Sequence, residues 1–203
     1  MKNLLAISYA LLVGLVLTGC DSNGNQTING TGDVESMEVE LPAFDGVNVI
    51  GTCNVDLTIG EPQSVEFYAQ SEVLDVMTYV VSDGMLQIGF KPDYTVNTSE
   101  EIRAEITIPS VSFVGITGAA DFELSGAQQD QLDIYITGTG NVEAFDMVVD
   151  DCNIQISGAR NCQVHVIDNL DIVISGVGNI RYRGTPTVTT DVSGVGDISP
   201  DGK

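Results

Sequence analysis

A glycine-centred segment recurs through the second half of the chain, and this repeat constrains the fold more than any other feature. The central glycines are 20, 20, 18 and 18 residues apart, at Gly118, Gly138, Gly158, Gly176 and Gly194. In each copy an alternating apolar run precedes a corner of the form Ser/Thr-Gly-x-x-Asn/Asp, and a second alternating run follows. A fixed period with strand-like alternation is typical of stacked repeats. The sequence therefore predicts an all-β solenoid with coils of about 18–20 residues.

The corner residues are expected to have a structural role. Glycine tolerates positive φ at a tight corner, and Asn and Asp hydrogen-bond their local backbone there. Coils stacked about 4.8 Å apart would align these residues into ladders. The predicted corner ladder comprises Gly138, Gly158, Gly176, Gly194, Asn141, Asn161, Asn179 and Asp197.

The first half of the chain also alternates with strand period from residue 36 onward. Turn signals occur at Gly60-Glu-Pro, Asp83-Gly84 and Lys91-Pro-Asp. A short helix is predicted over Ser71–Met77, with Ser71 as its N-cap. We expect one β-solenoid domain over residues 36–203, with clear repeats over 112–198. The polar, Gly- and Asn-rich residues 20–35 are expected to form a flexible linker.

The N-terminus has the pattern of a bacterial lipoprotein signal peptide over residues 1–19. Lys2 is followed by a mostly apolar run, which ends in Leu17-Thr-Gly-Cys20. This ending resembles a lipobox, in which the cysteine is acylated, for example with palmitate, and becomes the mature N-terminus. We therefore expect lipidation at Cys20 and a membrane anchor. The protein would then be an outer-membrane lipoprotein of the bacterial cell envelope, on its surface or its periplasmic face. The alternative is an ordinary cleaved signal with an incidental cysteine.

The charge balance excludes several kinds of partner. Lys and Arg number 7 against 29 Asp and Glu, which gives a formal charge of −22. Nucleic acids are not expected as partners, because phosphate binding needs clustered basic residues. Apolar residues make up 43% of the chain, which is enough for a core. The chain has one histidine, so there is little material for histidine-based catalysis.

Three groups of residues invite a chemical interpretation. The Gly-x-Gly pieces lack the following helix that a dinucleotide site requires. Asp150 and Asp151 could serve as an acid–base pair, although an acidic, solvated turn is the favoured reading. No cofactor is expected, with Ca²⁺ bound from the medium as the alternative because oxygen ligands are plentiful. Arg160, Arg181 and Arg183 either pair with nearby acids or form a basic spot that binds an anionic glycan.

Three cysteines remain after Cys20. Cys152 and Cys162 fall on inward positions, and Cys53 lies far upstream. The favoured interpretation is buried free thiols, and the alternative is a disulfide between Cys152 and Cys162.

Three further segments lead to a family resemblance. The chain contains Phe44-x-x-Val-x-Val-Ile-Gly-x-x-x-Val, then a Gly-Met-Leu-x-Ile strand and an Ile-x-Ile-Pro strand ahead of the repeats. Over about residues 38–198 it resembles the bacterial family described as "putative auto-transporter adhesin, head GIN domain". The resemblance implies right-handed parallel β-helical coils, a secreted or lipid-anchored protein and an adhesive role. It brings no catalytic residues to transfer.

The expected function is that of a non-catalytic envelope lipoprotein, an adhesin that presents a β-solenoid binding surface. Expected partners are the membrane, through the lipid anchor, and a glycan or a host or matrix protein. Homo-oligomerisation would protect a terminal strand edge. One alternative is a β-helical polysaccharide lyase or hydrolase that acts through Asp150, Asp151 or Asp171. The other is a periplasmic structural or envelope-stress protein.

Overall fold

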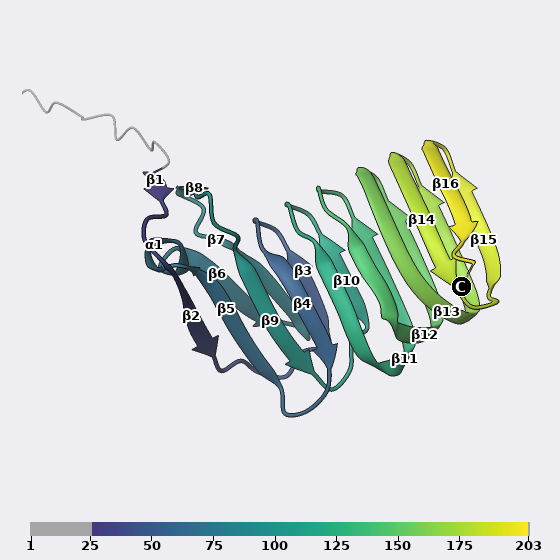
Figure 1. Ribbon diagram of the computed structural model, residues 1–203, viewed down its shortest axis with the longest axis horizontal. Coiled ribbons are helices and arrows are strands. Elements are labelled where there is room, and N and C mark those ends of the chain that lie inside the picture. The colour runs from purple at the N-terminus through teal and green to yellow at the C-terminus, as the bar shows by residue number, and fades with distance from the viewer. Residues whose placement is uncertain (1–25, 203) are drawn as a thin grey trace, which may run out of the picture.

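The computed structural model describes residues 26–202 as an almost entirely β structure (Figure 1). The expected signal peptide and Cys20 lie outside the described residues. One helix, α1 (Ser71–Leu74), lies near the N-terminal end. The strands are β1 (Gln26–Asn29), β2 (Val34–Val39), β3 (Gly46–Val49), β4 (Asn54–Ile59), β5 (Ser64–Gln70), β6 (Met77–Ser82), β7 (Met85–Phe90), β8 (Tyr94–Asn97), β9 (Arg103–Ile108), β10 (Phe113–Ile116), β11 (Phe122–Ile136), β12 (Val142–Ile156), β13 (Ala159–Ile174), β14 (Val177–Arg183), β15 (Thr187–Val192) and β16 (Val195–Pro200).

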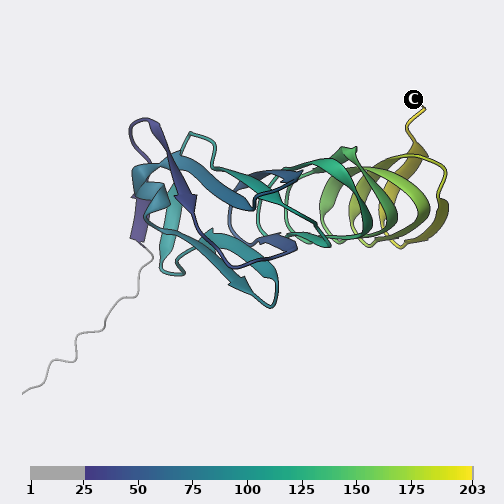
Figure 2. The ribbon, with the colours of Figure 1, turned by 90° about the horizontal axis from the view of Figure 1, so that it is seen from below.

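Fourteen of these strands belong to one curled, open sheet. The long strands β11, β12 and β13 bend, so each contributes to both arms of the curl (Figure 2). The first part of β11 pairs with β4, and its last part pairs with β10. The front arm therefore runs in the order β2, β5, β9, β4, β11, and the back arm runs β6, β7, β3, β10, β11. The apolar core lies between the two arms.

The repeat copies pair in parallel and in register. Leu132 lies opposite Cys152, Cys152 opposite Leu170, and Leu170 opposite Val188. Inward positions of neighbouring copies therefore stack on one another, and side chains such as Ile134 and Ile154 are fully buried. Because alternate strand residues point to opposite faces, this register sends every intervening polar side chain outward.

The expected right-handed parallel β-helix is wrong. The N-terminal part of the sheet contains three antiparallel pairs, β2 with β5, β5 with β9, and β6 with β7. Asp83 and Gly84 have φ values of 52° and 77°, and they join β6 to β7 as a two-residue hairpin. Such a turn reverses the chain, so the next strand must pair antiparallel. The fold is a curled sheet of mixed strands.

Two local expectations also need correction. The described part of the predicted linker contains β1, which pairs with β8, and the start of β2 at Val34. Strands can pair through their main chains without an alternating apolar pattern, so the polar composition of this segment did not reveal the strand. Asn97 Nδ2 adds a side-chain hydrogen bond of 2.9 Å to Asn29 Oδ1. The helix is shorter than predicted, and its N-cap is Gln70 rather than Ser71.

The corner glycines are needed for close approach rather than for positive φ. None of the five repeat glycines has a positive φ. A Cβ on Gly138 would overlap the carbonyl oxygen of Gly118, and one on Gly176 would overlap that of Gly158. The series begins upstream at Gly51, whose carbonyl oxygen faces Gly118. Consecutive coils therefore pack backbone against backbone at this corner.

We predict that Gly176→Ala lowers the free energy of unfolding by about 1–3 kcal/mol, because the added methyl overlaps a backbone oxygen that no rotamer change can move. Gly60→Ala is the matched control, since its Cβ would meet only the Thr107 side chain at 3.4 Å. Urea unfolding of both variants measures the effect. Equal stability of the two variants would contradict the close-approach explanation.

Candidate binding face

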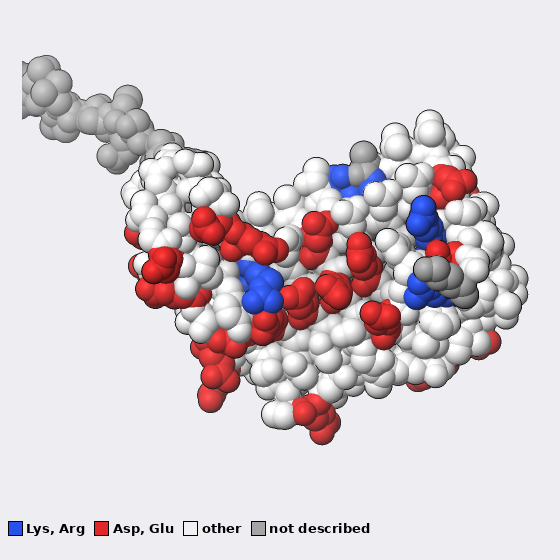
Figure 3. Space-filling view, viewed as in Figure 1, with Lys and Arg blue, Asp and Glu red and all other residues white. Residues whose placement is uncertain are grey.

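The front arm carries a continuous row of carboxylates. Strand register places one acidic residue opposite the next across six adjacent strands, and we call this set the acidic row: Glu38, Glu66, Glu105, Asp56, Glu123 and Glu143. Neighbouring strands are about 4.8 Å apart, so each carboxylate has like charges beside it. Figure 3 shows acidic side chains gathered across this face, with basic side chains toward its C-terminal end.

One arginine offsets charge in the N-terminal half of the acidic row. Arg103 contacts Asp56 at 2.9 Å and Glu105 at 2.6 Å, and its guanidinium lies 4.6 Å from the centre of the Tyr68 ring. The Tyr68 hydroxyl shares its single proton between Glu66 at 2.8 Å and Glu105 at 3.1 Å. These contacts bind three strands, β5, β9 and β4, together through their outward side chains.

These contacts shift the pKa values of Glu66 and Tyr68. Hydrogen bonds from the Ser36 and Tyr68 hydroxyls hold the pKa of Glu66 below its ordinary value. The same hydrogen bond to Glu66 raises the pKa of Tyr68 to about 12, because the phenol must remain protonated to donate it. Glu66 therefore stays ionised at neutral pH, and Tyr68 stays protonated as its hydrogen-bond donor.

The C-terminal half of the acidic row is not neutralised. Glu123 and Glu143 are exposed, and neither has a hydrogen-bond or ion-pair partner within residues 26–202. Beyond Glu143 the same register continues through Gln163, Arg181 and Ser199. The row therefore changes from negative to neutral to positive along the face.

A second line of polar side chains runs beside the acidic row, and we call it the amide ladder. It contains Asn54, Asp121, Asn141, Asn161, Asn179 and Asp197. Asn161 Nδ2 donates to Asn141 Oδ1 at 3.3 Å, and Asn179 Nδ2 donates to Asn161 Oδ1 at 3.1 Å. Each step joins one repeat copy to the next by a side-chain hydrogen bond.

The three arginines singled out in the sequence have different surroundings. Arg160 donates a hydrogen bond to the carbonyl oxygen of Gly138 at the corner. Arg183 contacts Asp201 at 2.9 Å and lies 3.9 Å from the centre of the Phe145 ring. Arg181 has no hydrogen bond, ion pair or ring contact in the described part of the chain.

Asp150 and Asp151 each face an amide. Gln128 donates to Asp150, and Asn169 Nδ2 donates to Asp151 at 2.6 Å. Asp133 similarly accepts a hydrogen bond from Asn153 at 2.7 Å. Amide partners of this kind hold neighbouring copies together. Within residues 26–202, no group of three or more His, Cys, Asp or Glu side chains is arranged to hold a metal ion.

The three described cysteines are buried free thiols. Burial raises the pKa of Cys53 and of Cys162 to about 12, and it raises that of Cys152 as well. A thiol held protonated is a weak nucleophile, so these cysteines act as small apolar core residues. Among the described helices, none combines the length and apolar character needed to cross a membrane.

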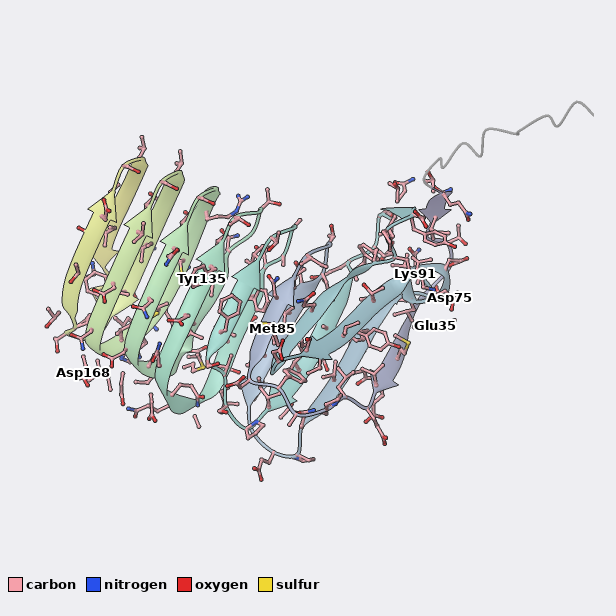
Figure 4. All side chains as sticks on the ribbon, turned by 180° about the vertical axis from the view of Figure 1, so that it is seen from behind. Glu35, Asp75, Met85, Lys91, Tyr135 and Asp168 are labelled. Carbon is pink, nitrogen blue, oxygen red and sulfur yellow. The ribbon has the colours of Figure 1, made fainter. Side chains whose placement is uncertain are left out.

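Sequence reasoning missed the N-terminal part of the acidic row. Glu66 lies between buried Val65 and Phe67, and Glu105 lies between buried Ala104 and Ile106, so alternation marked both as outward-facing. The sequence did not predict that these residues align across strands, because the spatial order β2, β5, β9, β4 differs from the order of the strands along the chain. The back arm carries a different set of outward residues, among them Tyr135, and Asp168 lies at the lower end of the strands (Figure 4).

These features define a class of repeat-built, all-β domain with a charged face of aligned side chains. The family model described as "Putative auto-transporter adhesin, head GIN domain" matches residues 43–144 and 114–186. The chain belongs to this family, as the motifs in the sequence indicate.

Several solved structures are similar to this chain. A putative adhesin from Bacteroides fragilis has a TM-score of 0.61 at 18% identity, with 85% of this chain and 99% of that chain covered. A putative adhesin from Parabacteroides merdae has a TM-score of 0.48 at 18% identity, with 86% and 98% covered. A putative lipid binding protein from Parabacteroides distasonis has a TM-score of 0.49 at 15% identity, with 86% and 99% covered. The first likeness supports the curled mixed sheet in place of the parallel β-helix. No curated protein matches the chain.

We predict that Arg103→Gln lowers the free energy of unfolding by about 1 kcal/mol at low salt, because Asp56 and Glu105 lose their shared cation. The loss should shrink in about 0.5 M NaCl, which screens repulsion between the exposed carboxylates. Denaturant titrations at the two salt concentrations test this. The double variant Arg103→Gln/Glu105→Gln should recover part of the stability, and a salt-independent loss would refute the charge explanation.

Proposed function

We propose that this protein is a non-catalytic adhesin of the bacterial cell envelope, anchored in the outer membrane by a lipid on Cys20. Its front face, which carries the acidic row and the amide ladder, makes the contact with a glycan or a matrix protein. The observation that carries the proposal is the alignment of outward polar side chains in register across the whole front arm. Such a face offers many weak contacts in a fixed pattern.

The family and the chemistry of the face both support this role. The matching family is described in terms of adhesins, and the similar structure from Bacteroides fragilis is named a putative adhesin. The acids that a hydrolase would need are tied to amides, as Asp150 is to Gln128 and Asp151 is to Asn169. Charged groups arranged across a face contribute to the specificity and the rate of association with a partner.

The adhesive role predicts that binding depends on the front face. Cells that display the protein should adhere to at least one surface in a panel of immobilised glycans and matrix proteins. Glu123→Lys/Glu143→Lys should change that adhesion by about tenfold or more, because both carboxylates are exposed and neither has an ion-pair partner among the described residues. Asp171→Lys/Asp191→Lys is the matched control, since it makes the same charge change at exposed positions on the back arm.

Protease shaving of intact cells accompanies this assay. Loss of the domain from intact cells would agree with a surface role. Protection until the cells are lysed would place the domain in the periplasm and overturn the adhesin proposal. Adhesion that responds equally to the front-face and back-face variants would also count against it.

The lipid anchor makes a separate prediction. Cys20→Ser removes the acylated sulfur, so the protein should move from the membrane fraction to the soluble fraction. Fractionation with an antibody against the domain measures this, and Cys53→Ser serves as a cysteine control. A Cys20→Ser chain that stays with the membrane would refute lipidation at this residue.

A further inference from the structure

A groove lies at the C-terminal end of the front face, where the register of the acidic row reaches Arg181. It has a volume of about 420 Å³ and is lined by Asn161, Cys162, Gln163, Asn179, Arg181 and Asp197. Gln163 of β13 lies opposite Arg181 of β14, and Asn179 lies opposite Asp197 of β16. Three adjacent strands therefore hold these side chains in a fixed arrangement.

Arg181 supplies the groove with a positively charged guanidinium group. The other arginines for which acid contacts are seen, Arg103 and Arg183, lie within 3 Å of carboxylate oxygens. Arg181 lacks such a partner among residues 26–202, although the chain carries a formal charge of −22. A guanidinium presents a planar set of N–H donors that fits a carboxylate through two parallel hydrogen bonds. The groove can therefore receive one carboxylate from outside.

The amide side chains of the groove can form hydrogen bonds with the hydroxyl groups of a ligand. Gln163 has no hydrogen bond to any described residue, so its amide is free both to donate and to accept. Asn161 and Asn179 each use one Nδ2 hydrogen in the amide ladder, and each retains a second. Hydroxyl groups also donate and accept, and they match amides in this respect. Apart from the buried Cys162, every side chain of the lining is polar.

Nearby acids limit the charge of the ligand. Asp197 accepts a hydrogen bond from Ser199 at 3.0 Å and offers its remaining lone pairs to a ligand hydroxyl. Asp197 lines the same groove as Arg181, and Glu143 lies opposite Gln163 on the next strand. A phosphate dianion or a polyanionic chain would be repelled. A single carboxylate surrounded by hydroxyls fits all of these groups.

We propose that this groove is a subsite for a sugar unit that bears one carboxylate, of the uronic-acid kind, at the end of an otherwise uncharged glycan. Arg181 binds the carboxylate, Gln163 and the two asparagines bind ring hydroxyls, and Asp197 accepts a hydroxyl. The inference rests on the proposed adhesive function and names the ligand class of its binding face.

The test compares methyl glucuronide with methyl glucoside, which differ only at C6, where the glucuronide has a carboxylate and the glucoside a hydroxymethyl group. Binding to the full chain carrying Cys20→Ser is followed by NMR titration. The glucuronide should bind at least about tenfold more tightly than the glucoside, and Arg181→Gln should remove that difference. Lys91→Gln is the charge-matched control, because Lys91 contacts the Asp75 carbonyl oxygen at the opposite end of the molecule (Figure 4). Arg181→Lys should give intermediate affinity, since it keeps the charge and loses the planar fork.

Two further probes separate the alternatives. If inorganic phosphate or acetate binds as tightly as the glucuronide, the groove is a general anion site and the saccharide proposal is overturned. Glucuronide binding that survives Arg181→Gln, or equal binding of the two glycosides, also overturns it. Cells that display Arg181→Gln and still adhere to a glycan or matrix surface would leave the adhesive function standing. If wild-type cells adhere to no surface in the panel, the proposed function itself is refuted.

Discussion

In-register pairing between successive repeat copies is the interaction on which the rest of this structure depends. It stacks Leu132, Cys152 and Leu170 inward, where aliphatic burial stabilises the curl. The same register aligns Glu123 with Glu143, and Asn161 with Asn179, on the outer face. A slip of one residue would reverse both faces at once, so the core and the binding face cannot be specified separately.

Close backbone approach at the glycine corner allows this pairing to continue without interruption. Gly118, Gly138 and Gly176 each face a carbonyl oxygen of the preceding copy at a distance that excludes a side chain. The glycines therefore constrain packing between copies, whereas the amide ladder supplies hydrogen bonds between the same copies. At the N-terminal end the Asp83–Gly84 hairpin ends the parallel pattern, and antiparallel strands complete the sheet.

The charge of the front face follows from the same geometry. Aligned strands bring six carboxylates together at a cost in repulsion, which Arg103 and the Tyr68 hydroxyl offset in one half of the acidic row. The other half lies next to a groove whose Arg181 has no carboxylate partner in the part of the chain that the structure describes. The charge of the front face changes sign along its length. The face can therefore discriminate between ligands by the position of their charged groups as well as by their total charge.

The sequence alone determined the β class, the parallel repeat period and the family, because alternation and the spacing of Gly118, Gly138 and Gly158 are local and periodic. It also marked Arg181 as a binding candidate and the corner asparagines as a structural ladder, although it could not separate Arg181 from Arg183. Only the tertiary structure decided that the sheet is curled and mixed, that Glu105 lies between Glu66 and Asp56, and that Arg183 is tied to Asp201. The reason is physical: strand pairing between distant segments depends on the whole sheet, and no local pattern records which strand lies beside which.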